Sequence, residues 1–131
     1  MIGVDTSVLL RYLVGSPPEQ AARATRLLET ESEIGISLIA LMETAHVLRT
    51  QYGVARTAIV DALIELLTRT NMAALGQSTQ DVIDALVVAR ALPGTPIPDA
   101  LIVLASRTGG ALPIYTFDSA LGRHGSPVAT P

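Results

Sequence analysis

The sequence predicts an α/β fold, in which a parallel sheet is built from strands alternating with helices. Three observations lead to this prediction. Short apolar runs alternate with longer stretches of helical periodicity along the whole chain. The length of 131 residues is that of one ordinary domain, and 49% hydrophobic against 16% charged residues allow a sizeable core. No repeat, low-complexity tract or long linker divides the chain, so we expect a single domain over residues 1–131.

The first part of the chain supplies one expected strand and two helices. Residues 1–4 form an apolar run, and a helical stretch follows from Thr6 to Val14, with Gly15 as its stop. The segment Ser16-Pro17-Pro18-Glu19 predicts the next helix start, with Ser16 as N-cap and Glu19 completing a capping box. That helix is expected to end near Glu29.

The middle of the chain repeats this alternation. Residues 34–36 form the second apolar run, and Ser37 is expected to cap a helix with apolar residues at a 3.6-residue period, ended by Gly53. A further helix is expected over residues 55–68, and a third strand over residues 72–75.

The last part of the chain contains two helices and two short strands. Ser78 is expected to open a helix to about Ala91, and Pro98 to start one over residues 99–108, stopped by Gly109 and Gly110. Residues 114–116 form a fourth apolar run, and residues 128–130 are a candidate fifth strand at the sheet edge.

Composition excludes several kinds of site. The chain has no cysteine, so disulfides, zinc–thiolate centres and thiol nucleophiles are excluded. All nine basic residues are arginines, which excludes sites that need a lysine, such as a phosphate-binding P-loop. With four aromatic residues in all, the chain is too poor in rings for a base-stacking platform. No signal peptide or membrane-spanning stretch is recognised, and a cytoplasmic location is expected.

Four acidic residues fall where a parallel sheet binds its ligands, at the carboxyl ends of the strands. Asp5 directly follows the first apolar run, and Asp118 follows the fourth with one residue between. Asp99 is expected in the first turn of its helix and Glu43 in the second turn of the helix after residues 34–36. Without these four acids, eight carboxylates remain against nine arginines, so the net charge of −3 is concentrated at this edge.

Each acid also has an ordinary explanation. Asp5 and Asp118 are plausible N-caps, Asp99 suits the positive end of a helix dipole, and a solvated glutamate such as Glu43 is common in helices. The hydroxyls of Thr6, Ser7 and Thr116 lie beside two of the acids in sequence and are supporting candidates that orient a carboxylate or a metal-bound water.

The functional interpretation is a site for a hard divalent cation. Mg²⁺ and Mn²⁺ prefer carboxylate oxygens and water as ligands, and such a site can activate water to break a phosphodiester bond. We therefore expect a metal-dependent nuclease with Asp5, Glu43, Asp99 and Asp118 as its catalytic residues.

Four motifs in this order resemble the PIN-domain family, and within it the small VapC-like toxins of toxin–antitoxin pairs. They are Ile2-Gly3-Val4-Asp5-Thr6-Ser7, Ser37-Leu38-Ile39-Ala40-Leu41-Met42-Glu43 with Val47-Leu48, Ile97-Pro98-Asp99-Ala100-Leu101-Ile102, and Thr116-Phe117-Asp118.

The resemblance implies a three-layer α/β/α fold with strand order 3-2-1-4-5 and a Mg²⁺- or Mn²⁺-dependent endoribonuclease. It implies that Asp5 and Asp99 bind the metal, and that Glu43 and Asp118 complete the acidic cluster. It further implies a homodimer, an RNA substrate and a small antitoxin protein that occupies the active site. Pro98 stands where many relatives carry an additional acid, so the number of metal ions, one or two, stays open.

The histidines and arginines carry weaker signals, and two other functions are compatible with the sequence. His46 lies three residues after Glu43, and a structural or solvated role is favoured for it, while His124 near the C-terminus supports no inference. Arg11, Arg49, Arg107 and Arg123 are candidates for phosphate contacts. The alternatives are a catalytically silent PIN-fold binding module and an aspartate-based phosphatase or receiver-like protein, the latter disfavoured because its usual lysine is absent.

Overall fold

The computed structural model describes residues 1–131 and contains a three-stranded parallel sheet. Strands β1 (Ile2–Val4), β2 (Ile34–Ile36) and β3 (Met72–Ala74) lie in the order β1-β2-β3, with Gly3 opposite Gly35 and Gly35 opposite Ala73. All three residues of β2 are buried, as expected for the central strand of a covered parallel sheet. The α/β class and the parallel sheet are therefore confirmed.

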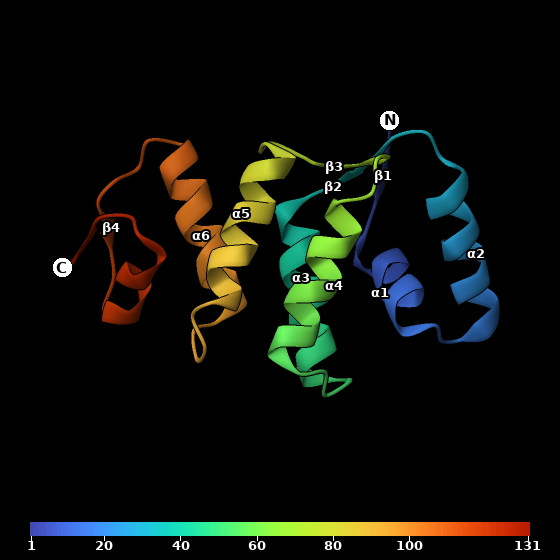
Figure 1. Cartoon of the computed structure of the whole chain (residues 1–131), viewed down its shortest axis with the longest axis horizontal. Helices are drawn as coiled ribbons and strands as arrows, with labels where there is room; N and C mark the ends of the chain where they lie inside the picture. The colour runs from blue at the N-terminus through green and yellow to red at the C-terminus, as the bar shows by residue number, and fades with distance from the viewer.

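Six α-helices and one 3₁₀ helix surround and extend this sheet (Figure 1). They are α1 (Thr6–Val14), α2 (Pro18–Thr30), α3 (Leu38–Thr50), α4 (Arg56–Leu67), α5 (Thr79–Arg90), α6 (Ile97–Thr108) and η1 (Ser119–His124).

The helix boundaries follow the caps that the sequence predicts at several positions. Ser37 and Ser78 accept hydrogen bonds from the backbone N–H groups of Ala40 and Asp81 at the starts of α3 and α5. Gly15 ends α1 in the left-handed region, at φ 77°, which glycine adopts without steric cost.

The predicted cap of α2 is wrong. The N-cap is Pro17, not Ser16, and no side chain caps this helix, so the expected capping box with Glu19 is absent. Helix α2 begins at Pro18, which places Ser16 one residue too early to reach the first free N–H groups. A first-turn proline is tolerated because it has no N–H to leave unpaired.

Strands β4 (Ile114–Tyr115) and β5 (Val128–Ala129) form a separate two-stranded parallel sheet. The partial orders 3-2-1 and 4-5 are thus observed, but strands 1 and 4 do not pair as the expected continuous order requires. Helix α6 packs against α3 and α5, and β4 lies beyond these helices at the opposite end of the long axis from α1 and α2 (Figure 1). The backbone N–H groups of Ile114 and Thr116 donate to the carbonyls of Pro127 and Ala129 instead.

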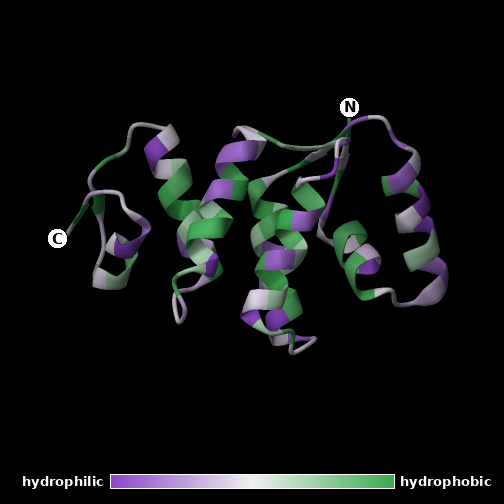
Figure 2. Cartoon of the chain, in the orientation of Figure 1, coloured by the Kyte–Doolittle hydropathy of each residue, from purple (hydrophilic) through white to green (hydrophobic).

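The main core joins the three-stranded sheet to all six α-helices. Its fully buried side chains include Leu9 of α1, Leu28 of α2, Leu41 of α3, Leu63 of α4 and Leu86 of α5, together with Leu101 and Leu104 of α6. Figure 2 shows hydrophobic residues running along α1, α3 and α6, whereas α2 carries hydrophilic residues along much of its length. None of the helices has the length and apolar character that crossing a bilayer requires.

Candidate active site

Asp5 lies at the carboxyl end of β1 and is the N-cap of α1. Its Oδ1 accepts hydrogen bonds from Ser7 Oγ at 2.6 Å and from the backbone N–H of Val8 at 3.2 Å. These donors, the Ser7 hydroxyl first, hold the pKa of the exposed Asp5 carboxyl below its ordinary value. Asp5 is therefore a fixed, fully ionised carboxylate at neutral pH, and Ser7 is the side chain that orients it.

Glu43 lies in the second turn of α3 and is exposed. It makes no hydrogen bond or ion pair, so nothing in the structure fixes its carboxylate. Helix α3 packs against both α1 and α6, which makes it the element between the helices of Asp5 and Asp99.

Asp99 is the third residue of α6 and is partly buried. Burial raises the pKa of its carboxyl above the ordinary value; His124 acts against this increase, and the charge of Asp118 adds to it. The ionised form of Asp99 is therefore destabilised by lost hydration. The positive end of the helix dipole, in whose first turn Asp99 lies, compensates for part of this cost.

Asp118 lies between β4 and η1. Its Oδ1 accepts a hydrogen bond from the backbone N–H of Ala120 at 2.9 Å, which makes Asp118 the cap of η1. Thr116 Oγ1 accepts a hydrogen bond from the backbone N–H of Asp118 at 2.9 Å. Thr116 therefore binds the backbone of Asp118, whereas the exposed Asp118 carboxylate is used to cap η1.

His124 is the residue near the site that the sequence did not single out. It ends η1, is buried, and its Nε2 has no hydrogen-bond partner. Burial lowers the pKa of His124, an effect that Asp99 opposes and Arg56 reinforces. The signal in the sequence was the spacing of Leu121 and His124, because residues three apart share one face of a 3₁₀ helix and both are buried here.

Arg56 holds the loop that precedes α6. Its guanidinium donates to the Thr95 carbonyl at 2.7 Å, to the Ala89 carbonyl at 2.6 Å and to Thr95 Oγ1 at 3.2 Å. Thr95 is buried, and α6 begins two residues later. Arg56, His46 and Arg49 also line a cavity of about 170 Å³ that reaches Pro98, so basic side chains approach the start of α6.

The four acids do not meet in one cluster. Asp99 and Asp118 lie close enough to raise the cost of ionising Asp99, with His124 beside them. Asp5 stands at the end of β1, which Figure 1 places far from β4 and η1 along the long axis. No group of three or more Asp, Glu or His side chains lies close enough to hold one metal ion. The donor chemistry suits a hard cation, but the residues as placed do not complete a site for it.

A family model described as PIN domain matches residues 2–126 of the chain. The chain belongs to the PIN domain family. PIN domains are generally nucleases, and the α/β/α fold that the sequence motifs imply is confirmed. The match spans all four candidate acids and His124. A search of curated proteins finds no match to this PIN domain.

Proposed function

We propose that this PIN domain is an endoribonuclease that hydrolyses RNA phosphodiester bonds and requires Mg²⁺ or Mn²⁺. Membership of a family of nucleases supports the reaction class. The observation that carries the proposal within this chain is the placement of Asp99, Asp118 and His124 around the start of α6. Burial, and to a lesser extent the charge of Asp118, raises the pKa of Asp99, and a bound cation would favour the ionised form of such a carboxylate.

The chain offers the groups that hydrolysis of a phosphodiester needs on the protein side. Water adds to phosphorus and one P–O bond breaks; the attacking water loses a proton, and the leaving oxygen gains one from solvent. An ionised carboxylate within reach of that water can take the proton, and Asp5 and Asp118 are exposed. Arginine side chains can hold the phosphate oxygens by charge-assisted hydrogen bonds.

The cation requirement rests on ligand chemistry. Mg²⁺ and Mn²⁺ prefer carboxylate oxygens, and the chain has no cysteine to favour a softer metal. We expect Asp5 and Asp99 to be the metal ligands, with Glu43 and Asp118 contributing negative charge. Binding of one cation by both ligands requires a rearrangement that brings Asp5 and Asp99 together.

The biological role that we propose is that of a toxin in a toxin–antitoxin pair, acting as a homodimer on cellular RNA in the cytoplasm. The VapC-like motifs around the four acids support this role. A cognate antitoxin is expected to place an arginine or lysine among the carboxylates, since such a cation neutralises them. Replacing that side chain of the antitoxin by alanine should restore cleavage in the complex.

A cleavage assay on a mixed RNA pool tests the activity. We expect cleavage in Mg²⁺ or Mn²⁺ and none in excess EDTA, with a loss of at least a hundredfold in Asp99→Asn and Asp118→Asn. Asp81→Asn, which changes an exposed aspartate on α5, is the matched control and should retain full activity. Undiminished cleavage in EDTA, or equal rates for the Asp99 and Asp81 variants, would contradict the proposal.

The lack of three acidic or histidine side chains close enough to hold one metal ion favours a second candidate, a PIN-fold module that binds RNA without cutting it. The same assay distinguishes the two functions. A wild-type protein that retains labelled RNA on a filter but leaves it intact in both Mg²⁺ and Mn²⁺ would be such a module.

A further inference from the structure

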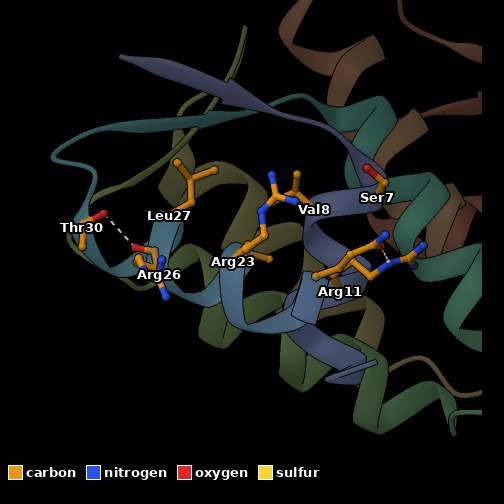
Figure 3. Close-up of a pocket in the computed structure, with 9 residues that line it drawn as sticks. Ser7, Val8, Arg11, Arg23, Arg26, Leu27 and Thr30 are labelled. Atoms are coloured by element: carbon orange, nitrogen blue, oxygen red, sulfur yellow. Dashed lines mark hydrogen bonds between the residues drawn. The ribbon is translucent and has the colours of Figure 1, made fainter. Parts of the chain in front are cut away.

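A hollow lies between α1 and α2, away from Asp99 and Asp118. This α1–α2 groove has a volume of about 500 Å³, and its lining includes Arg11, Arg23 and Arg26 with Val8 and Leu27 (Figure 3). Ser7 also lines it. No carboxylate does, although the chain as a whole has more acidic than basic residues.

The arginines of the groove are not neutralised within the protein. The two ion pairs of the structure join Arg90 to Asp61 and the N-terminal amine to Glu33. Arg11 donates through Nε to Gln20 Oε1 at 2.6 Å, a neutral partner that leaves its charge uncompensated. Figure 3 shows Arg23 reaching from α2 toward Val8 on α1, so its guanidinium lies along the groove.

The groove-lining residues of α2 form a row along the helix. Gln20, Arg23, Leu27 and Thr30 lie three or four residues apart, which places them on one face of the helix over about 15 Å. Arg26 lies three residues after Arg23 and also lines the groove, so α2 presents two positive charges to it that no ion pair neutralises. An anionic ligand in the groove can form charge-assisted hydrogen bonds with such side chains.

One end of the groove reaches the proposed site. Ser7 lines the groove and donates its hydroxyl hydrogen to Asp5 Oδ1 at 2.6 Å. An anionic chain lying in the groove would therefore end beside Asp5. The apolar side chains of Val8 and Leu27 leave room for the uncharged parts of such a chain.

From this geometry we infer that the α1–α2 groove binds the phosphate backbone of single-stranded RNA and leads it to Asp5. This inference rests on the proposed function, because it assigns the path of the same substrate. An acidic protein segment would meet the same arginines. RNA is favoured because it is the substrate of the proposed function and because the groove ends at a candidate catalytic acid.

Fluorescence anisotropy with a labelled single-stranded RNA 12-mer in EDTA tests the groove. We expect the double variant Arg23→Gln/Arg26→Gln to bind at least tenfold more weakly at low salt. The dependence of log Kd on log salt concentration should fall by about 1.4, since each phosphate contact to a single strand contributes about 0.7. Arg23→Lys/Arg26→Lys keeps both charges and should retain the wild-type salt dependence. Circular dichroism melts check that each variant is folded.

The charge-matched control is Arg90→Glu, which lowers the net charge by the same two units at an exposed position on α5, outside the groove. This variant should bind RNA within twofold of wild type. Equal losses in Arg90→Glu and Arg23→Gln/Arg26→Gln would overturn the assignment and indicate binding by net charge alone. A glutamate-rich 12-mer peptide that binds as tightly as RNA, and is equally weakened by Arg23→Gln/Arg26→Gln, would also overturn it, in favour of an acidic protein partner.

Failure of the groove and failure of the nuclease proposal give different results. RNA binding that is weakened by Arg23→Gln/Arg26→Gln, without cleavage in Mg²⁺ or Mn²⁺, supports RNA binding by the groove and contradicts the nuclease proposal. Metal-dependent cleavage, together with RNA affinity that is unchanged in Arg23→Gln/Arg26→Gln, supports the nuclease proposal and contradicts the assignment of the groove.

Discussion

Two aspartates of this PIN domain have opposite electrostatic environments. Donors from Ser7 and Val8 lower the pKa of Asp5, whereas burial raises the pKa of Asp99. The Asp5 anion is stabilised by donors of its own helix, whereas the Asp99 anion lowers the stability of the folded state because it is partly buried. Substitutions at the two positions should therefore change stability in opposite directions.

Replacing Asp5 separates its role as a helix cap from its role in cleavage. Asp5→Ala removes the cap of α1 and should lower the free energy of unfolding by about 1 kcal/mol at pH 7. Asp5→Asn retains a good capping side chain and should melt close to wild type, yet lose nearly all RNA cleavage because the charge is gone. Urea unfolding and the RNA assay measure the two effects.

The pH dependence of Asp5→Ala has a defined sign. The folded-state pKa of Asp5 is lowered, so its contribution to stability is present above the unfolded pKa of about 4 and is lost as the pH falls through the folded value. The difference between wild type and Asp5→Ala should therefore shrink in acid. A difference that stays constant or grows as the pH falls would contradict this account.

Asp99→Asn should stabilise the metal-free protein at pH 7. The folded-state pKa of Asp99 is raised, so the folded state binds more protons between the unfolded and folded pKa values, and stability falls as the pH rises through that window. Asparagine removes the buried charge, and no ion pair is lost because the lowered pKa of His124 keeps that ring neutral at pH 7. Urea unfolding in EDTA should show a more stable variant at pH 7.

The advantage of Asp99→Asn should disappear near pH 3, where Asp99 is protonated in both states. Asp81→Asn again serves as the control and should have little effect at either pH. An Asp99→Asn protein that unfolds more easily than wild type at pH 7 would show that the carboxylate acts mainly on the helix dipole.

At the scale of elements, Arg56 connects α4 to the loop before α6. Arg56→Gln leaves the carbonyls of Ala89 and Thr95 without their donor, and we expect a loss of about 2 kcal/mol in the free energy of unfolding. Arg56→Lys should recover little of it, because an ammonium cannot reproduce the planar set of donors. Arg49→Gln, on the same cavity but exposed, is the control. Equal stability of the Arg56 and Arg49 glutamine variants would contradict this role.

The elements also show how far the sequence predicts this fold. Strand β2 at residues 34–36, the stop of α1 at Gly15 and the caps Ser37 and Ser78 were all predicted, because each depends on local periodicity and capping chemistry. The cap at Ser16 was wrong because two prolines in a row made the start of α2 ambiguous by one residue.

Contacts between elements that are distant in the sequence are harder to predict from local patterns. Whether β4 pairs with β1 or only with β5 depends on how α6 packs against α3 and α5, which no local pattern encodes. The same holds within the candidate site: sequence motifs identify Asp99 and Asp118, but the burial of His124 beside them is a property of the packed 3₁₀ helix.

At the scale of the whole molecule, the C-terminal segment has little core of its own. From β4 to the end of the chain, the buried side chains are Leu121, His124 and Ser126, and η1 packs on α5 and α6. Segments with few buried contacts open at a lower free energy than the core. Hydrogen exchange should therefore be faster at the amides of Ile114 and Thr116 than at those of Ile34 and Met72 in the buried sheet. Equal protection of all four amides would show that the segment opens only with the core.

The separate sheet of β4 and β5 has a consequence for how this protein would respond to mutation and temperature. The low burial of the segment that contains Asp118 and His124 predicts that it opens and closes locally, while the melting temperature reports the larger core. Weakening the closed state, for example by Leu121→Ala, would lower the fraction of molecules in which Asp118 and His124 lie beside Asp99, with a smaller effect on global unfolding. Activity would then decline on warming at temperatures where the remainder of the molecule is still folded.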